Sequence, residues 1–207
     1  MRLSSGDELF VFNGESGEFK AAYIDKHSVE IREQTRAPSA ENKLTLLFAP
    51  IKFGKIDFLV EKATELGVTE LQPVHTKFTN VGRINYDRMR SNVIEAAEQS
   101  GRITIPEVRE EVRFEKLLDS WDGRKIIFCD EKLKGQPIAE ALSGLPKGEY
   151  AILIGPEGGF SQEETAALRE KQYVISVTMG KRLLRAETAA LAALAVFQAS
   201  GLGDWQS

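Results

Sequence analysis

From Lys43 onward, short apolar runs alternate with segments in which apolar residues recur at helical spacing. The run "LTLLFAP" at residues 44–50 is typical of a buried strand, whereas residues 56–66 carry the apolar pattern of a helix that Gly67 ends. A second helix is predicted around residues 89–97. The other apolar runs contain the segments "LQPV", "ITIPEV", "KIIFCD", "YAILIG" and "YVISVTMG". This alternation over residues 43–207 predicts an α/β domain in which helices cover both faces of a parallel sheet.

Residues 1–36 have a different pattern, in which apolar and polar residues alternate. Two such segments, Glu8–Phe12 and Phe19–Ile24, flank the turn sequence "NGESG" and predict a small antiparallel β module. The segment "TRAPSAEN" at residues 35–42 is polar, contains a proline and is typical of a linker. We therefore expect two domains, a β module at residues 1–38 and the α/β domain at residues 43–207.

Cysteine content and charge narrow the functional classes. The single cysteine, Cys129, excludes an internal disulfide and a cysteine-based metal cluster, and its apolar neighbours favour a buried thiol. A net charge of −4 gives no overall attraction to nucleic acid, but it leaves room for a local basic face. Because the sequence shows neither a signal-peptide pattern nor an apolar run long enough to span a bilayer, a cytoplasmic protein is expected.

The segment "ILIGPEGGFSQEE" at residues 152–164 places glycines between a predicted strand and a predicted helix. Ser161 and Glu164 have the spacing of a capping box that opens the helix. Ligands of open α/β sheets bind at the carboxyl ends of strands, so this turn is a candidate ligand site. The alternative is a tight connection whose glycines serve only to adopt positive φ.

Three classes of ligand could bind at such a turn. A phosphate-binding P-loop requires a lysine directly after the glycines, and the next lysine is Lys171. The glycine spacing also differs from that of a dinucleotide-binding fingerprint. The remaining class is a planar or zwitterionic small molecule that the backbone approaches closely, and the carboxylate of Glu157 favours a positively charged one.

A second informative segment is "VTMGKRLLRAETAALAALAVFQASG" at residues 177–201. It predicts the end of a strand, a loop with the cations Lys181, Arg182 and Arg185, and a helix that is apolar on nearly all sides. Such a helix is expected to be buried because it offers no polar face to water. The alternative for the cations is a solvated loop that pairs with Glu187.

Together these two segments resemble the SPOUT superfamily of S-adenosylmethionine-dependent RNA methyltransferases, and within it the small-subunit ribosomal RNA uridine-N3 methyltransferase family. The resemblance extends to "KIDFLVEKATELGVTELQPV", "EAAEQSGRITIPEV" and, more loosely, "GDELFVFNG". It implies a SPOUT-type parallel sheet with a C-terminal deep trefoil knot. It also implies an N-terminal PUA-like barrel, which is expected to be incomplete at its front edge because family members have additional residues ahead of the "GDEL" stretch.

The family also implies a cofactor, S-adenosylmethionine, enclosed by three loops that follow strand ends near Cys129, Gly155 and Met179. It implies a homodimer that acts on ribosomal RNA or the small ribosomal subunit, without a metal. The residues expected to bind the cofactor are Cys129, Leu153, Gly155, Pro156, Glu157, Gly158, Gly159, Met179, Gly180, Leu183 and Leu184.

The implied reaction transfers a methyl group to N3 of a uridine in 16S ribosomal RNA. Because N3 carries a weakly acidic proton on the Watson–Crick edge, the base must be unpaired and its anion stabilised. Arg185 is the first candidate for stabilising this anion and Arg102 the second. Glu187 is a candidate base or a residue that orients an arginine.

A basic cluster, in which Asp87 is the only acidic residue that offsets the positive charge in the sequence, is expected to contact RNA. Its residues are Lys77, Arg83, Arg88 and Arg90, with Lys181 nearby. The alternative is that these residues form a solvated helix face. Two other functions remain open from the residues. One is a catalytically silent knotted RNA-binding protein, and the other is a nucleotide-dependent metabolic enzyme, which the missing phosphate and dinucleotide motifs disfavour.

Overall fold

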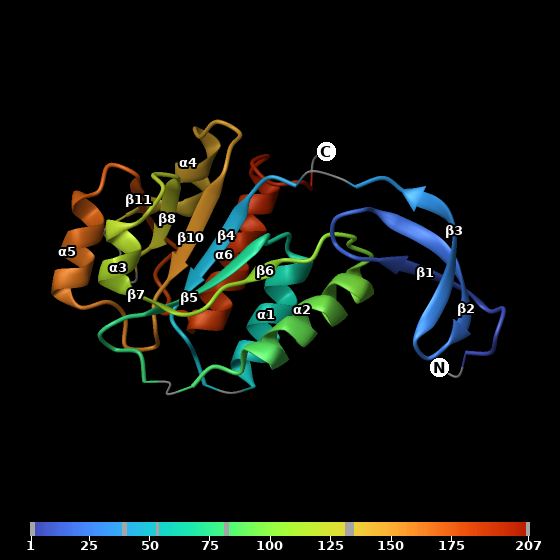
Figure 1. The fold of residues 1–207 in the computed structure, drawn as a ribbon. Helices are drawn as coiled ribbons and strands as arrows, with labels where there is room; N and C mark the ends of the chain where they lie inside the picture. The colour runs from blue at the N-terminus through green and yellow to red at the C-terminus, as the bar shows by residue number, and fades with distance from the viewer. Residues whose placement is uncertain (1–2, 39–40, 53, 81–82, 131–134, 206–207) are drawn as a thin grey trace. The chain divides into compact units, whose positions relative to one another are not determined.

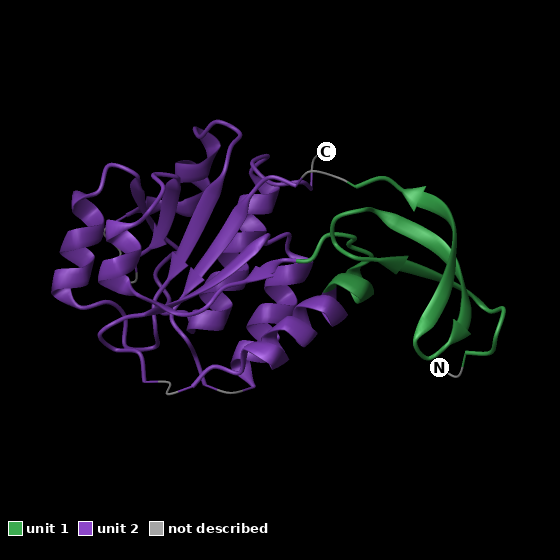
Figure 2. Ribbon diagram, in the orientation of Figure 1, with its two compact units in different colours: residues 1–40, 97–105 green, residues 41–96, 106–207 purple. Residues whose placement is uncertain are grey.

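A computed structural model describes residues 3–38, 41–52, 54–80, 83–130 and 135–205. The chain divides into two compact units (Figure 2). Unit 1 contains residues 1–40 and 97–105, and unit 2 contains residues 41–96 and 106–207. Residues 97–105, which the sequence pattern assigns to the α/β domain, therefore group with the N-terminal strands.

Unit 1 contains a three-stranded antiparallel sheet in the order β1-β2-β3. Its strands are β1 (Glu8–Phe12), β2 (Glu18–Asp25) and β3 (Ser28–Arg36). The predicted turn between β1 and β2 forms because Asn13 Oδ1 accepts hydrogen bonds from the backbone amides of Glu15 and Ser16. The linker prediction was wrong at its start, since Thr35 and Arg36 still belong to β3.

Unit 2 contains a sheet of eight strands in which all pairings are parallel, as predicted. The order is β6-β5-β4-β10-β8-β11-β9, and β7 also pairs with β5. The strands are β4 (Leu44–Phe48), β5 (Glu70–His75), β6 (Glu107–Val108), β7 (Val112–Arg113), β8 (Lys125–Cys129), β9 (Gln136–Pro137), β10 (Tyr150–Ile154) and β11 (Val174–Thr178). Only the last two residues of "ITIPEV" are strand.

Helices pack on both faces of this sheet (Figure 1). They are α1 (Lys55–Glu65), α2 (Tyr86–Ser100), α3 (Phe114–Asp119), α4 (Ile138–Ser143), α5 (Gln162–Glu170) and α6 (Ala186–Ala199). On one face, Leu153 of β10 packs in a core cluster with Phe114 of α3 and Leu168 of α5. Tyr150 of the same strand lies 5.6 Å from the ring of Phe197 in α6, measured between centroids. Tyr150 and Leu153, an odd number of positions apart on the strand, thus contact helices on opposite faces of the sheet.

Helix α6 is less completely buried than its sequence predicts. Ala190, Ala193, Leu194 and Phe197 are buried on the side that packs against β10, α1 and α4. The other side is also apolar, yet residues such as Val196 remain half-buried in the single chain. The prediction of burial on all sides is therefore wrong for the single chain, because several apolar residues of α6 keep part of their surface exposed.

Candidate cofactor-binding site

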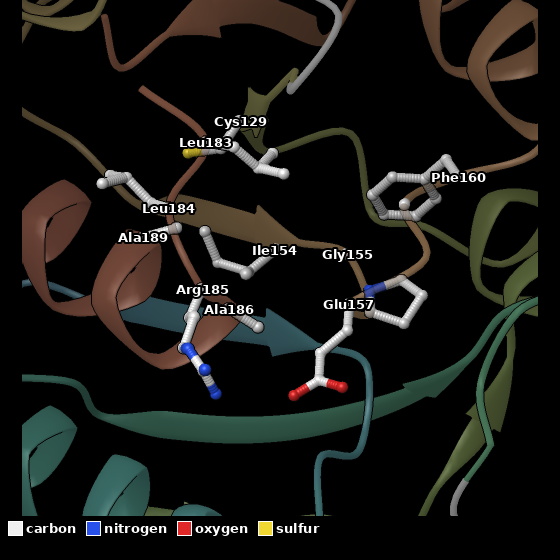
Figure 3. Close-up of a pocket in the computed structure, with 12 residues that line it drawn as sticks. Cys129, Ile154, Gly155, Glu157, Phe160, Leu183, Leu184, Arg185, Ala186 and Ala189 are labelled. Carbon is white, nitrogen blue, oxygen red and sulfur yellow. The ribbon is translucent and has the colours of Figure 1, made fainter. Parts of the chain in front are cut away.

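The carboxyl ends of β8 and β10 and the start of α6 surround a cavity of about 320 Å³ (Figure 3). This volume lies within the range of small-molecule sites in proteins. The lining residues are Cys129, Ile154, Gly155, Pro156, Glu157, Gly159, Phe160, Leu183, Leu184, Arg185, Ala186 and Ala189. Most of them are apolar or contribute backbone, whereas Glu157 and Arg185 are the charged members.

A second cavity, of about 130 Å³, adjoins the first and shares part of its wall. The shared residues are Cys129, Leu183, Leu184 and Ala189. The second cavity adds Asp130, Met179, Gly180, Lys181 and Arg182. The strand ends near Cys129, Gly155 and Met179, which the family resemblance brings to one site, therefore line two adjoining cavities.

The glycine turn after β10 is held in place by Phe160. A Cβ atom at Gly155 would lie 2.6 Å from Cε2 of the Phe160 ring, so a side chain at this position clashes with the ring. Phe160 in turn packs edge-on against Phe128, with ring centroids 5.2 Å apart. Gly159 has a φ of +69°, a conformation that favours glycine. The turn thus needs glycine for conformation, as the alternative in the sequence analysis holds, and also for internal packing, which that analysis did not include.

The predicted capping box is confirmed where the turn enters α5. The amide of Glu164 donates to Ser161 Oγ at 3.1 Å, and the amide of Ser161 donates to Glu164 Oε2 at 2.8 Å. Glu164 Oε1 also accepts a hydrogen bond from the amide of Lys77. This buried carboxylate therefore fixes both the start of α5 and the segment after β5.

Two of the predicted cofactor residues do not line either cavity. The side chain of Leu153 is fully buried in the core cluster. A Cβ at Gly158 would lie 3.3 Å from Cβ of Phe78, so this glycine permits close packing of a neighbouring segment. Their roles in cofactor binding stay predictions, whereas Phe160, Ile154, Ala186 and Ala189 join the site without any signal in the sequence analysis.

Cys129 contributes a thiol to the wall of both cavities. Loss of solvation raises the pKa of this thiol to about 12. The group is therefore protonated at neutral pH and acts as an uncharged wall. This agrees with the inert thiol that its apolar neighbours predict.

Lys55, at the start of α1, forms ion pairs with two carboxylates beside the larger cavity. Its Nζ lies 3.0 Å from Glu157 Oε1 and 3.3 Å from Glu187 Oε1. The hydrogen bond from Lys55 is the main cause that lowers the pKa of Glu157, followed by the charges of Lys55, Lys52 and Arg185. Lys55 begins a segment that the family resemblance includes, but no local pattern marks it as a site residue.

Arg185 and Glu187 do not form an ion pair with each other in the described part of the chain. The Arg185 side chain is exposed and makes no hydrogen bond or ion pair with the residues that the structure describes. Figure 3 shows its guanidinium on the same side of the cavity as the Glu157 carboxylate. Glu187 instead pairs with Lys55 through Oε1, while its buried Oε2 has no hydrogen-bond partner within the described ranges.

A family model described as the RNA methyltransferase domain matches residues 38–198. The chain belongs to this family. Ribosomal RNA small subunit methyltransferase E of Rickettsia conorii is 34% identical over 199 residues, which are 94% of this chain and 82% of that protein. The resemblance to small-subunit ribosomal RNA methyltransferases is thereby confirmed.

Solved structures give the same family. The ribosomal RNA small subunit methyltransferase E of Neisseria gonorrhoeae, bound to S-adenosylmethionine, superimposes with a TM-score of 0.80 at 30% identity, covering 95% of this chain and 84% of that one. A protein of Legionella pneumophila in complex with the same cofactor gives a TM-score of 0.82 at 28% identity, covering 96% and 85%. Both likenesses extend over nearly the whole of this methyltransferase-family chain.

The basic cluster is more neutralised than the sequence predicts. Lys77 lies 3.3 Å from Glu163, Arg88 lies 2.8 Å from Asp57, and Arg90 lies 3.3 Å from Asp87, each measured between N and O. The expectation that Asp87 alone offsets the cluster was wrong, because Glu163 and Asp57 are distant in sequence. Arg83 is exposed and forms no ion pair with an acidic group in the described ranges. Lys181 is also exposed, and it lines the smaller cavity.

Arg102 belongs to unit 1, and its Nε donates a hydrogen bond to Thr104 Oγ1 at 2.8 Å. It does not line either cavity, so its catalytic role stays a prediction. The residues that the structure describes contain no group of three or more His, Cys, Asp or Glu side chains that could hold a metal ion. Within the same ranges, no helix has the length and apolar character needed to cross a membrane.

Proposed function

We propose that this chain is an S-adenosylmethionine-dependent methyltransferase that modifies N3 of a uridine in 16S ribosomal RNA of the small ribosomal subunit. The observation that carries the proposal is the cavity at the ends of β8 and β10, with the loop after β11 along its wall, in a chain of the RNA methyltransferase family. Relatives of similar length are named as small-subunit ribosomal RNA methyltransferases, and solved ones hold this cofactor.

The lining of the cavity suits a molecule that combines a planar ring with a positive charge. Ile154, Leu183 and Leu184 offer apolar walls for an adenine ring, and the backbone of the glycine turn is open to close approach. The anionic carboxylate of Glu157 favours a sulfonium. When bound, the cofactor supplies an electrophilic methyl group, and the protein has to orient the acceptor and exclude water.

The acceptor is the weakly acidic N3 of an unpaired uridine. Negative charge that develops on the uracil oxygens as the N3 proton leaves requires a cation nearby. Arg185 is suited to this task because it lines the cavity and its guanidinium has no acidic partner among the described residues. Arg102 of unit 1 is the second candidate, and Glu187, which binds Lys55, is the proposed base or orienting residue.

Finer features of the family belong to the same proposal. They are a deep trefoil knot formed by the loop after β11 and α6, a PUA-like unit 1 that contacts RNA, and a homodimer. The loop at residues 179–185 that lines the cavities before α6 packs against β10 supports the knot. The half-buried apolar side of α6 supports a second copy as its partner. A substrate in the ribosome implies a cytoplasmic location.

The test uses purified protein, labelled S-adenosylmethionine, and both free 16S RNA and assembled small subunits that lack the modification. We expect incorporation of one methyl group at uridine N3, mapped by nuclease digestion and mass spectrometry. The variant Arg185→Met is expected to lower kcat about 100-fold, because it removes the anion-stabilising donor, and to retain cofactor affinity in calorimetry. Cofactor binding without turnover on either RNA would favour the catalytically silent RNA-binding protein.

A further inference from the structure

Three charged side chains from distant parts of the sequence meet beside the cofactor cavity. Lys55 comes from the start of α1, Glu157 from the glycine turn and Glu187 from the first turn of α6. The single ammonium group contacts both carboxylates, at 3.0 Å and 3.3 Å. One cation thus connects two segments of the site.

Glu187 is largely buried, so its carboxylate needs the positive charge of Lys55 to be stable. The Glu187 side chain is 14% exposed, and its buried Oε2 has no hydrogen-bond partner among the residues that the structure describes. Lys55 is the cation that pairs with this carboxylate among the described residues. A largely buried carboxylate without a cation is costly, so after loss of Lys55 it would attract another one. Arg185 is two residues away at the junction of the loop and α6, and its side chain has no acidic partner in the described part of the chain.

Glu157 is also within electrostatic range of Arg185. The charge of Arg185 contributes to lowering the pKa of this carboxyl, although less than Lys55 does. In Figure 3 the two side chains start from different segments, and their charged ends lie on the same side of the cavity. Both carboxylates beside the cavity are therefore alternative partners for Arg185, and Lys55 occupies them.

We propose that Lys55 is a positioning residue that holds Glu157 and Glu187 so that the Arg185 guanidinium stays free for the anion of the target base. The inference rests on the proposed function, because it assumes that Arg185 acts on the uracil. Lys55 itself does not line the cavity and would not contact the reacting atoms.

The experiment compares kcat and cofactor affinity in Lys55→Met, Lys55→Arg, Glu157→Gln and the double variant Lys55→Met/Glu157→Gln. We expect Lys55→Met to lower kcat at least tenfold with cofactor affinity changed less than threefold, because Arg185 turns to the released carboxylates. Lys55→Arg keeps the charge and is expected to recover most of kcat. In the Glu157→Gln background, the loss caused by Lys55→Met should shrink several-fold, because one competing carboxylate is gone.

Lys62→Met is the matched control, since Lys62 lies on the same helix and, in the part of the chain that the structure describes, forms ion pairs only with Glu61 and Glu65 of α1. It should keep wild-type kcat. Wild-type kcat in Lys55→Met would overturn the inference. It would also be overturned if Lys55→Met lowered kcat and cofactor affinity in parallel, and equally in the wild-type and Glu157→Gln backgrounds, because that result indicates a purely structural role. If wild-type protein binds the cofactor and methylates nothing, the proposed function fails instead.

Discussion

The cofactor cavity and the basic cluster show two different ways of making a binding surface. The cavity is lined mainly by uncharged side chains and backbone whose positions are fixed by packing, as for Gly155 against Phe160. The basic cluster lies on the surface, and most of its cations already have an acidic partner. Binding in the cavity therefore depends on shape, whereas binding by the cluster depends on which charges remain available.

The largest expected effect comes from changing the shape of the cavity. Gly155→Val places a branched side chain where even a Cβ would lie 2.6 Å from the Phe160 ring. The ring or the turn must shift, which should lower the free energy of unfolding by about 1–3 kcal/mol and cofactor affinity by about 100-fold. Urea unfolding and calorimetric titration with S-adenosylmethionine measure the two effects.

Gly144→Ala serves as the control, since a Cβ at that position has open space around it and its φ is −99°. It should leave the free energy of unfolding within about 0.5 kcal/mol of wild type. Unchanged cofactor affinity in folded Gly155→Val would show that the turn does not shape the site. Binding in the cavity would then not depend on shape in the way that distinguishes it from the basic cluster.

The same contrast explains what the sequence could predict. The parallel sheet, the end of α1 just before Gly67, the capping box of Ser161 and the strand ends around the cavity follow from residues close together in the chain. Periodicity and turn chemistry are local, so they are readable in one sequence. Strand β3 was missed as a separate element because most of its residues are exposed, which leaves only a weak alternation.

The site residues that were missed depend on contacts between distant segments. Lys55 reaches Glu157 and Glu187 across more than a hundred positions of sequence, and Phe160 joins the cavity because it packs against Phe128. Asp57 and Glu163 likewise neutralise cations of the basic cluster that appeared unopposed in the sequence. Pairing of this kind is set by the tertiary fold, and no local pattern reports it.

A smaller effect should separate paired from unpaired cations within the basic cluster. Arg83→Ala removes a cation without an acidic partner among the described residues, whereas Arg88→Ala removes one that is held by Asp57 at 2.8 Å. We expect Arg83→Ala to weaken binding of a 16S RNA fragment about threefold or more and to reduce the slope of log affinity against log salt by about 1. Filter binding at several salt concentrations gives both values.

Arg88→Ala should change RNA affinity less than Arg83→Ala and instead lower stability, because it leaves Asp57, which also accepts a hydrogen bond from Asn92, without its cation. Equal salt slopes for the two variants would mean that ion pairing within the protein does not decide which cations meet RNA.

The smallest effect concerns Lys77 and its partner Glu163, both exposed at the surface. The backbone amide of Glu163 itself, the Ser161 hydroxyl and Lys77, in that order, lower the pKa of the Glu163 carboxyl to about 2. A carboxyl whose pKa is lowered on folding stabilises the protein above its unfolded pKa, near 4.5, and this contribution is lost as pH falls toward 2. Between pH 5 and 8 the Glu163 carboxyl is therefore ionised.

Glu163→Gln releases Lys77 throughout that range, so RNA affinity at low salt should rise about twofold and by the same factor at pH 5 and pH 8. Because the pair is exposed and screened, the gain should disappear at high salt. A gain that changes between pH 5 and 8 would show that another group titrates with the pair. A loss of RNA affinity would show that Glu163 orients Lys77 toward RNA. An acidic neighbour would then strengthen the contact of a surface cation with RNA instead of weakening it.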